Sequence, residues 1–490
     1  MARDAESGAP SAATSLEFFS QISQTEWPQI PNPWAAGIAA LLYQLEQTQW
    51  WPEADLAERQ WRQTKAILQH AWATTPLYRE IYGRAGLAPD DIRSRKDWQR
   101  LPVVDRSMLQ AAGAAWRSDS PPQDHGALLQ HFTSGSSGRP LHSISTTLTH
   151  LFKTALVLRQ HQWAGRKLGC KAAFIEEVDG GAAAGIRHSG TWEKATEHVV
   201  RTGPALAISL RLDTATQLEQ LRAFEPSYLI AYPSVIEALA RHCLSHRISL
   251  PFLQQVGCFG EVLDPACRTL ARQAWNVRIV DMYSAKEAGP IALQCPVHDC
   301  YHEQPEAMLV EILDADGREC RPGETGRVVL TSLHNFAAPL IRYEIGDLAT
   351  RGRTCACGRT LPVIERILGR QRNMLRYPDG SARWPSLSET GFAAVFAQAG
   401  DMPPVQQFQL VQHSLARIEA RLVTARPYTA AEEALLADYL HGEFGPHWQI
   451  DFSYPDAIAR GPTGKFEDFL SHVAPEAMPP DAGPQEGDAA

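Results

Sequence analysis

A stretch rich in hydroxyl groups and glycine, TSGSSGRP at residues 133–140, has the composition of a loop that binds an anion. Backbone N–H groups, hydroxyls and one cation can together surround a phosphate. A Walker loop needs four residues between its glycines and then Lys-Ser/Thr, whereas here two residues separate Gly135 from Gly138 and Arg139 follows. The stretch is therefore not a Walker loop, and an ordinary Ser/Gly turn between strand and helix is the competing interpretation.

Two further stretches contain residues that bind metals. QCPVHDCYHE supplies Cys295, His298, Cys300 and His302, and RTCACGRT supplies Cys355 and Cys357. Short chelating pairs of this kind can close a tetrahedral zinc site. The other cysteines (Cys170, Cys243, Cys258, Cys267 and Cys320) are scattered singly, as buried thiols in a reducing compartment usually are. The competing interpretation for the two stretches is therefore reduced cysteines without metal.

The composition limits the possible functions. At 490 residues the chain suggests two or three domains, and its 44% hydrophobic and 21% charged content is ordinary for a globular enzyme. A net charge of -9 with no long basic run argues against nucleic acid as the main partner. No apolar run approaches the ~18 residues of a membrane span. The start, MARDAESGAP, lacks a basic region followed by an apolar one, so we expect a cytoplasmic protein.

Hydrophobic periodicity predicts an α/β fold with a small appendage. Residues 25–120 are mostly helical, with a helix at 56–75 that Pro76 ends. From about 125 to 370, short apolar runs such as AAFIEE, YLIAY, VRIVDMYS and VVLTSL alternate with helical segments such as SVIEALARHCLSH. Residues 371–472 restart after a charged linker with an alternating strand at 408–423 and a helix at 430–444. The ends, 1–24 and 473–490, are predicted to be disordered.

Five segments, in the family order, resemble the motifs of the adenylate-forming superfamily, whose members activate carboxylates as acyl-adenylates. They are TSGSSGRP, DMYSAKEAG at 281–289, PLIRYEIGDLA at 339–349, IERILGRQRNML at 364–375 and GPTGKF at 461–466. Residues 74–109, 225–240 and 258–264 resemble phenylacetate-CoA ligase-like proteins in particular. This resemblance implies a large, multi-subdomain N-terminal adenylation domain over 25–370 and a small, mobile α+β C-terminal domain over 371–472.

The resemblance implies a binding site for ATP and Mg²⁺. The residues implied in nucleotide binding are Thr133, Ser134, Gly135, Ser136, Ser137, Gly138, Arg139, Gly260, Glu261, Tyr283, Ser284, Asp347, Arg342 and Arg370. Within this set, the loop would hold the departing phosphates, Tyr283 would lie near the adenine, and Asp347 would accept hydrogen bonds from the ribose. For Arg342 and Arg370, expected near ribose and phosphate, a surface salt bridge is the competing interpretation.

Two residues are implied in catalysis. Glu287 would help to hold Mg²⁺ against the phosphates, because a hard cation prefers carboxylate and phosphate oxygens. Lys465, in GPTGKF, would neutralise charge that develops on the carboxylate and the α-phosphate. Taken alone, Glu287 is a solvated acid at the start of a helix and Lys465 is an exposed side chain.

The same resemblance implies a structural Zn²⁺ site and an acyl pocket. For zinc it favours Cys295, His302, Cys355 and Cys357, with His298 or Cys300 as substitutes. For the acyl group it implies Phe174, Tyr232, Pro233 and Phe259, together with Gly260, which suit an aromatic or cyclic carboxylate. These apolar residues could equally be core packing.

The chain departs from the family pattern at several positions. Arg139 replaces the usual lysine, Lys286 replaces a threonine, and Arg372 with Asn373 replaces the common acidic residue of the hinge. RYPDGSARWP also lacks the glycine-valine segment that helps to form the thioester-stage site of phenylacetate-CoA ligases. The sequence therefore supports the adenylation step better than it supports CoA as the acceptor of the acyl group.

We expect an AMP-forming ligase that adenylates an aromatic or cyclic acid and transfers the acyl group to CoA. The alternatives are transfer to an amine such as an amino acid, which gives an amide, and a non-catalytic nucleotide-binding scaffold. Segment 374–385 discriminates between the acceptors, because a passage for pantetheine requires small residues that face inward. The sequence leaves open whether the protein is a monomer or a homodimer.

Overall fold

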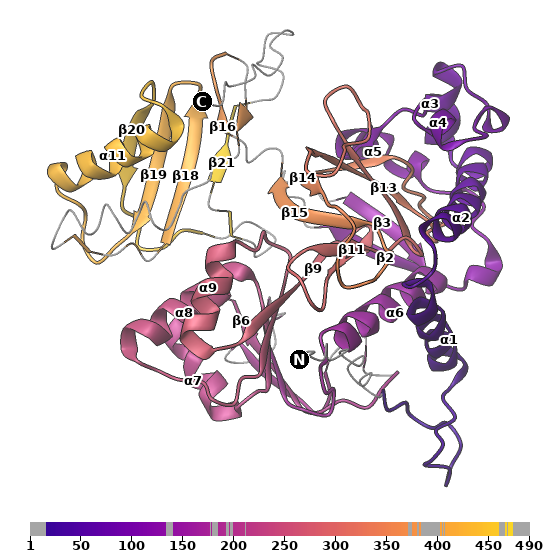
Figure 1. The fold of residues 1–490 in the computed structure, drawn as a ribbon, viewed down its shortest axis with the longest axis horizontal. Coiled ribbons are helices and arrows are strands. Elements are labelled where there is room, and N and C mark those ends of the chain that lie inside the picture. Colours follow the sequence, from indigo (N-terminus) through magenta and orange to yellow (C-terminus); the bar gives the residue numbers. More distant parts are fainter. Residues whose placement is uncertain are drawn as a thin grey trace, which may run out of the picture.

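The computed structural model describes most of the chain. The described residues are 16–133, 141–176, 178, 185–192, 196, 199–210, 212–370, 375–379, 382, 383, 402, 403, 405, 407–459, 466, 467 and 469–473, of which 131–133, 141, 142, 370, 382 and 383 are described by their backbone alone. The chain forms a large unit built on one extended sheet and a smaller unit with a sheet of its own (Figure 1). This arrangement confirms the predicted fold class.

One 13-stranded sheet organises the large unit, in the order β12-β13-β14-β15-β11-β10-β9-β8-β7-β4-β6-β5, with β1 beside β14. Its parallel part consists of β6 (Ala205–Ser209), β4 (Ala172–Glu176), β7 (Tyr228–Ala231), β8 (Gln255–Phe259) and β9 (Arg278–Ala285). At one edge β5 (Ile186–Ser189) runs antiparallel to β6. Several of these strands are short apolar runs, such as the fully buried ALAIS of β6, which is typical of strands covered on both faces.

Helices cover both faces of the parallel part. On one face α7 (Thr214–Phe224), α8 (Pro233–His246) and α9 (Pro265–Trp275) pack against β4, β6, β7 and β8 in one hydrophobic core. On the other face α1 (Pro33–Thr48) packs on α6 (Thr147–Trp163), and both contribute to a second core with Ala172, Ala205 and Tyr228. Both sides of these strands are therefore shielded from water.

The antiparallel part of the sheet extends from β9. Its strands are β10 (Gly289–Gln294), β11 (Tyr301–Glu303), β15 (Val363–Arg370), β14 (Tyr343–Arg351), β13 (Thr325–Ser332) and β12 (Met308–Leu313). The two-residue strand β1 (Val104–Asp105) pairs parallel with β14. Separately, β2 (Leu128–Thr133) and β3 (Leu141–Thr146) form a two-stranded hairpin, and the predicted anion-binding loop connects them.

N-terminal helices pack beside this antiparallel part. They are α2 (Glu53–Thr74), α3 (Pro76–Arg84), η1 (Pro89–Asp91), α4 (Arg95–Trp98), α5 (Arg106–Ala112), η2 (Gly113–Trp116) and η3 (Gln123–His125). The apolar stripe of α2 buries Leu56, Ile67, Leu68 and Ala71. Helix α2 ends at Thr74 because the residue before a proline disfavours helical geometry, which agrees with the predicted stop before Pro76.

The smaller unit has a four-stranded sheet, in the order β20 (Gln449–Ser453), β19 (Arg417–Val423), β18 (Gln407–Ser414) and β21 (Phe469–Ser471). Its helix α11 (Ala430–Phe444) starts at a capping box formed by Thr429 and Glu432. The single strand predicted at 408–423 is wrong, because β18 and β19 are two strands of a hairpin. Both strands share the period of two, and the turn between them contains no glycine or proline.

A short hairpin, β16 (Leu375–Arg376) with β17 (Ala382–Arg383), precedes the small sheet, and its Leu375 belongs to the core of the smaller unit. The boundary between residues 370 and 371 stays a prediction, because residues 371–374 lie outside the described part of the chain.

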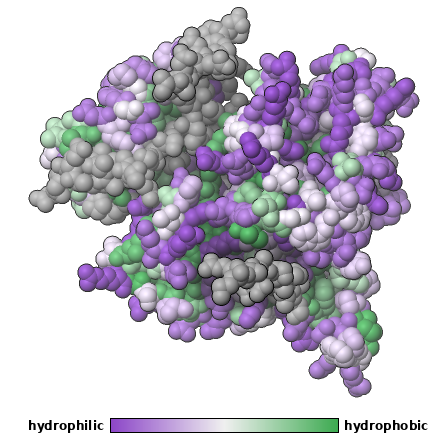
Figure 2. Space-filling view, viewed as in Figure 1, coloured by the Kyte–Doolittle hydropathy of each residue, from purple (hydrophilic) through white to green (hydrophobic). Residues whose placement is uncertain are grey.

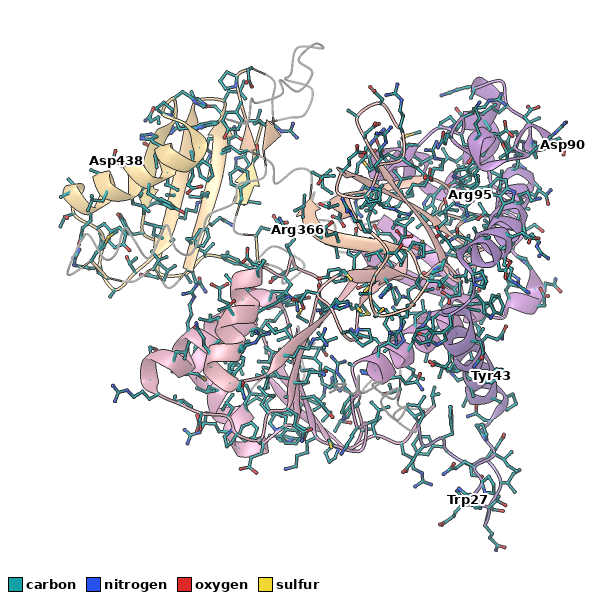
Figure 3. The ribbon with its side chains drawn as sticks, viewed as in Figure 1. Trp27, Tyr43, Asp90, Arg95, Arg366 and Asp438 are labelled. Atoms are coloured by element: carbon teal, nitrogen blue, oxygen red, sulfur yellow. The ribbon has the colours of Figure 1, made fainter. Side chains whose placement is uncertain are left out.

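Residues 16–24 correct the prediction of a disordered start in part. Phe18 forms a bridge with Val200, and the amide of Arg201 donates a hydrogen bond to the carbonyl of Glu17 at 2.6 Å. The segment that follows extends from the body of the molecule before it reaches α1. Trp27 lies on this segment and Tyr43 lies on α1, and both side chains are exposed (Figure 3). Residues 1–15 lie outside the described residues.

Hydrophilic and hydrophobic residues are interspersed on the face of the molecule that Figure 2 shows. Among the described residues, no helix combines the length and the apolarity that crossing a bilayer requires.

A buried arginine joins the N-terminal helices to the sheet. The Nη1 atom of Arg159, on α6, donates to Gln304 at 2.9 Å and to Glu306 at 3.2 Å, and its Nη2 atom donates to the carbonyl of Leu45 on α1 at 2.8 Å. Its side chain is 2% exposed, and these partners compensate for the loss of hydration of the buried positive charge.

We expect Arg159→Met to lower the free energy of unfolding by about 3–5 kcal/mol, the range for leaving one partner of a buried ion pair uncompensated. Denaturant unfolding followed by tryptophan fluorescence measures this loss. Arg62→Met breaks the exposed Arg62–Glu58 pair and should cost less than about 1 kcal/mol. Equal effects of the two variants would contradict the structural role given to Arg159.

Candidate active site and metal centre

The candidate active-site residues gather at the carboxyl ends of the parallel strands and on the antiparallel strands beside them. In open α/β sheets, ligands bind at the carboxyl ends of the strands. Phe174 is on β4, Tyr232 follows β7, and Phe259 ends β8. Tyr283 is near the end of β9, and Asp347 is on β14. The sheet thus brings together residues that are far apart in the sequence.

Glu287 lies in the turn between β9 and β10 and is held from two sides. Its Oε1 atom accepts a hydrogen bond from the hydroxyl of Tyr343 at 3.0 Å and lies 3.6 Å from Nη1 of Arg106. The carboxylate-bearing side chain is 7% exposed, so burial limits its possible orientations. A fixed carboxylate of this kind fits a role in holding a divalent cation.

Asp347 forms a second contact between a tyrosine and a carboxylate. The hydroxyl of Tyr283 donates to its Oδ2 atom at 2.8 Å, and both residues are buried. In the ladder of β14 with β15, Asp347 pairs with Arg370, which places these two candidates directly opposite each other. Stacking of Tyr283 on adenine stays a prediction, and the structure adds a contact that orients Asp347.

Glu261 follows a glycine with a positive φ of 80°, at the end of β8. This backbone conformation is easy for Gly260 and costly for residues with a Cβ atom. The Oε2 atom of Glu261 accepts a hydrogen bond from the amide of Ser234 at 3.0 Å, and its Oε1 atom accepts one from the amide of Phe466 at 2.6 Å. Phe466 follows Lys465 directly in the sequence.

Several predicted residues lie outside what the structure describes. Ser134, Gly135, Ser136, Ser137, Gly138, Arg139 and Lys465 are outside the described residues, and the side chains of Thr133 and Arg370 are not described. The backbone still shows that β2 ends at Thr133 and that β3 begins at Leu141. Ser284, on β9, pairs with Pro290 of β10. The nucleotide roles of all these residues stay predictions.

Two of the aromatic candidates for the acyl pocket, Tyr232 and Phe259, are neighbours, whereas Phe174 packs against the core that contains α1 and α6. The rings of Tyr232 and Phe259 lie 4.9 Å apart between centroids, at 43°. Pro233 is the first residue of α8 and is buried, and Phe174 is partly buried on β4, next to β7. Their assignment to the acyl pocket stays a prediction, because the same contacts also contribute to core packing.

The structure corrects the prediction that Arg342 lies near the ribose and phosphate. Its guanidinium forms a buried ion pair with Glu311, with Nη2 3.1 Å from Oε1, and its Nη1 donates to the carbonyls of Gln99 and Leu101. Burial raises the pKa of Glu311, and the charge of Arg342 opposes this rise. The arginine therefore supports β12 and β14 instead of reaching a nucleotide. The residue types around Arg342 in the sequence could not show that its side chain points into the core.

Two residues at Glu287 were missed by sequence reasoning. Tyr343 lies within the segment that resembles the ribose motif, next to Arg342, but its residue type alone does not assign it to Glu287. Arg106 begins α5, directly after β1, and reaches the site because β1 pairs with β14. Only this long-range pairing brings Arg106 near Glu287.

The candidate metal centre contains the predicted four residues. The ligand atoms of Cys295, His302, Cys355 and Cys357 all lie within 4.8 Å of one another. The Sγ atoms of Cys295 and Cys355 are 3.7 Å apart, close to the ~3.8 Å edge of a tetrahedron with Zn–S bonds of about 2.3 Å. The donor set and its spacing therefore fit Zn²⁺.

The surroundings of these residues also fit a metal centre. Nδ1 of His302 lies 3.4 Å from the carbonyl of Leu361, which leaves Nε2 facing Cys357 at 3.3 Å. The guanidinium of Arg278 donates to the carbonyls of Cys295, Pro296 and His298, and so holds the chelating turn.

The two possible substitutes are placed differently. His298 contributes its carbonyl to the contact with Arg278, whereas Sγ of Cys300 lies 3.6 Å from that of Cys355. A hydrogen bond from Cys300 lowers the pKa of Cys295 well below its usual value, which favours the thiolate form that binds metals. Geometry therefore favours His302 as the fourth ligand, with Cys300 beside the cluster.

Comparison with known proteins shows what the chain is similar to. The model of the AMP-binding enzyme family matches residues 196–337, and that of the CapK C-terminal domain matches residues 386–471. Phenylacetate-coenzyme A ligase of Pseudomonas putida is 26% identical over 328 residues, 65% of this chain and 72% of that protein. The enzyme of Escherichia coli K12 is 27% identical over 344 residues, with 66% and 72% covered. Protein CapK of Staphylococcus aureus is 27% identical over 271 residues, with 52% and 55% covered.

Solved structures share the fold. 2-Hydroxyisobutyryl-CoA ligase in the postadenylation state, in complex with R3-HIB-AMP, has a TM-score of 0.65 at 19% identity, covering 86% of this chain and 90% of that one. The same ligase in the thioesterification state, with 2-HIB-AMP and CoA, has a TM-score of 0.57 at 21% identity, covering 86% and 91%.

The matches and the fold together define the class as adenylate-forming enzymes, which are AMP-forming acid ligases. Within that superfamily, the chain is similar to the phenylacetate-coenzyme A ligases, at 26–27% identity over about two thirds of its length.

We expect Cys355→Ser to lose bound zinc and Cys300→Ser to retain it, because only the first change removes a member of the ligand set. Elemental analysis of the purified proteins measures the zinc-to-protein ratio, and thermal unfolding with and without a chelator measures the linked stability. Zinc lost from the Cys300 variant but kept in the Cys355 variant would show that the ligand set is wrong.

We expect Tyr283→Phe to raise the KM for ATP by about 5- to 10-fold, because Asp347 loses one orienting hydrogen bond worth about 1 kcal/mol. Steady-state kinetics with varied ATP measures the change. Tyr301→Phe is the matched control, since its hydroxyl donates to Asp281 instead. A similar rise in the control would indicate a general effect on the sheet.

Proposed function

We propose that this protein adenylates an aromatic or cyclic carboxylic acid with ATP and transfers the acyl group to CoA. The observation that carries the proposal is the position of two tyrosine–carboxylate contacts, Tyr283 with Asp347 and Tyr343 with Glu287. Each contact involves β9 or the turn that follows it, beside the aromatic pair of Tyr232 and Phe259. Phe259 pairs with Met282 in the ladder of β8 with β9, so Tyr283 comes one residue later on the neighbouring strand. An acyl site and a nucleotide site would thus adjoin.

Activation of a carboxylate by ATP brings two anions together, and the site needs compensation for their charge. Bound Mg²⁺ would supply positive charge at the phosphates, and Glu287 is the residue proposed to hold it. Tyr343 and Arg106 orient the Glu287 carboxylate. Asp347, oriented by Tyr283, is proposed to accept hydrogen bonds from the ribose hydroxyls.

The loop over 133–139 and Lys465 are proposed to act on the phosphates and the reacting carboxylate. The connection between β2 and β3 contains this loop. Support for Lys465 comes from the next residue, Phe466, whose amide donates a hydrogen bond to Glu261 in the large unit. This contact holds Phe466, the residue after the lysine, beside the end of β8.

The acyl group is proposed to lie against Phe174, Tyr232, Pro233 and Phe259. Aromatic side chains favour offset or edge contacts with another ring, and the tilted pair of Tyr232 and Phe259 already shows this geometry. The names of the phenylacetate-coenzyme A ligases support an aromatic acid and CoA as the substrate and the acceptor.

The Cys295, His302, Cys355 and Cys357 cluster is proposed to hold a structural Zn²⁺. Four protein ligands leave no open position for water, so the metal would have no catalytic role. It would tie the turn between β10 and β11 to the connection between β14 and β15, and so stabilise the strands that bear the active site.

An amine acceptor is the second candidate. In the segment that would form a passage for pantetheine, Leu375 and Arg376 are both buried, and the backbone of Arg376 is bonded to Gln412. These side chains are large where a passage would favour small ones. This observation favours transfer of the acyl group to an amine, which would give an amide.

Product analysis tests the proposal. Purified protein is incubated with ATP, Mg²⁺ and a panel of aromatic and cyclic acids, with CoA and amino acids in separate reactions, and products are identified by mass spectrometry. AMP with an acyl-CoA thioester is expected. AMP with an amide would favour the second candidate, and no AMP from any acid would contradict the enzyme assignment.

We expect Lys465→Ala to reduce ATP–pyrophosphate exchange by about 100- to 1,000-fold, the range for removing one group that stabilises transition-state charge. Lys96→Ala, on exposed α4, serves as the matched control and should leave exchange unchanged. Unchanged exchange in the Lys465 variant would favour the scaffold interpretation.

A further inference from the structure

The carboxylate of Glu261 connects a helix of the large unit to the smaller unit. Its Oε2 atom accepts from the amide of Ser234, in the first turn of α8, at 3.0 Å. Its Oε1 atom accepts from the amide of Phe466 at 2.6 Å. Each oxygen therefore has a different backbone partner, and the partners belong to different units.

The contact with α8 compensates for a missing helix cap. Tyr232 occupies the N-cap position and provides no side-chain hydrogen bond to the helix. The first amides of a helix lack partners within the helix, and a negative charge near them is favourable. Gly260, with its positive φ, turns the chain after β8 so that Glu261 reaches this position. Glu261 is thus fixed to the large unit.

The contact with Phe466 carries this attachment across to the smaller unit. The carbonyl of the adjacent residue, Glu467, accepts a hydrogen bond from Nε2 of Gln409, on β18, at 2.8 Å. Phe466 and Glu467 are consecutive, so one is bonded to the large unit and the other to the small sheet. Two residues later the chain enters β21, which pairs with β18.

We infer that Glu261 is a positioning residue, which holds the smaller unit in the arrangement for adenylation; this inference rests on the proposed function. Consecutive Cα atoms are about 3.8 Å apart, so a hydrogen bond at the amide of Phe466 restricts where Lys465 can be. The rotation of the smaller unit that the family resemblance implies for acyl transfer would break this bond. Glu261 therefore favours the first half-reaction over the second.

Two oxygens are needed for both tasks. Glutamine has one acceptor oxygen and would keep either the helix contact or the contact with Phe466, whereas alanine would lose both. A neutral acceptor would also lose the charge that strengthens both hydrogen bonds. A carboxylate is therefore the side chain that suits this position.

The main test compares Glu261→Ala with wild type in the two half-reactions, using the acid and acceptor found by product analysis. ATP–pyrophosphate exchange should fall by about 10- to 100-fold, the loss expected for a hydrogen bond to a charged group. Transfer of the acyl group from added acyl-adenylate should fall less than the exchange reaction, because the proposed role of the contact with Phe466 lies in the first half-reaction. An equal loss in both half-reactions would overturn the inference.

Asp264→Ala is the matched control for loss of a helix cap. Asp264 caps α9 through its Oδ1 atom, which accepts from the amide of Ala266 at 2.7 Å. Its loss should lower thermal stability to a similar degree but leave the ratio of the two half-reactions as in wild type. If this control shifts the ratio as Glu261→Ala does, the effect belongs to helix capping.

A second pair of variants changes the donor instead of the acceptor. Phe466→Ala keeps the amide N–H, whereas Phe466→Pro removes it and leaves Glu261 bonded to α8. Only the proline variant should lower the exchange reaction beyond the effect of losing the side chain. Equal activities of the two variants would contradict the inference even if Glu261→Ala does not fold.

Hydrogen exchange separates failure of this inference from failure of the proposed function. In full-length protein without substrate, the amide of Phe466 should be protected in wild type and in Asp264→Ala, and should exchange faster in Glu261→Ala. Equal exchange in all three would overturn the inference, whatever activity the protein has. Protection that depends on Glu261, in a protein that forms no AMP, would overturn the proposed function and retain the contact between the units.

Discussion

The arrangement of the active site depends on strand β9, which is shared by the parallel and antiparallel parts of the large sheet. On one side it pairs with β8, which ends at Phe259, and on the other with β10, across the turn that contains Glu287. Tyr283 near its end reaches Asp347 on β14. Because one strand belongs to both parts, the strand ends that bear Phe259, Glu287 and Asp347 are joined in a single sheet, in which Figure 1 labels β9, β14 and β15.

The second constraint is the orientation of acidic groups that are largely buried. Glu287 and Asp347 would both act beside a polyanion. Their orientations must therefore be set by groups that leave the net charge of the site nearly unchanged. A tyrosine hydroxyl does this for each, and it donates a hydrogen bond without adding a full positive charge. Arg106 contributes charge only at Glu287, where a cation and phosphates are proposed to meet. Arg342, which is bonded to Glu311 and to the carbonyls of Gln99 and Leu101, stabilises the sheet.

Two connections stabilise parts of the molecule that the sheet alone does not join. The cysteine and histidine cluster brings two chain connections together beside β11 and β15, and Arg278 supports one of them. Glu261 links the end of β8 to the smaller unit through a single side chain. The first is buried and multiply bonded, as suits a permanent element. The second consists of two hydrogen bonds from backbone amides to one carboxylate, and such bonds can break and re-form if the units change their arrangement, as the proposed function requires.

The sequence by itself determined the fold class, because hydrophobic periodicity is a local property. Its motifs carried the resemblance to the adenylate-forming superfamily, and that resemblance implied the four cysteine and histidine residues that the structure brings together. The sequence also located helix 430–444 and the stop before Pro76. The tertiary structure alone decided which side chains meet. Arg342 turns into the core, Arg106 reaches Glu287 through the pairing of β1 with β14, and residues 408–423 fold back as a hairpin. Each of these outcomes depends on contacts between distant segments, and local residue patterns carry no direct information about such contacts.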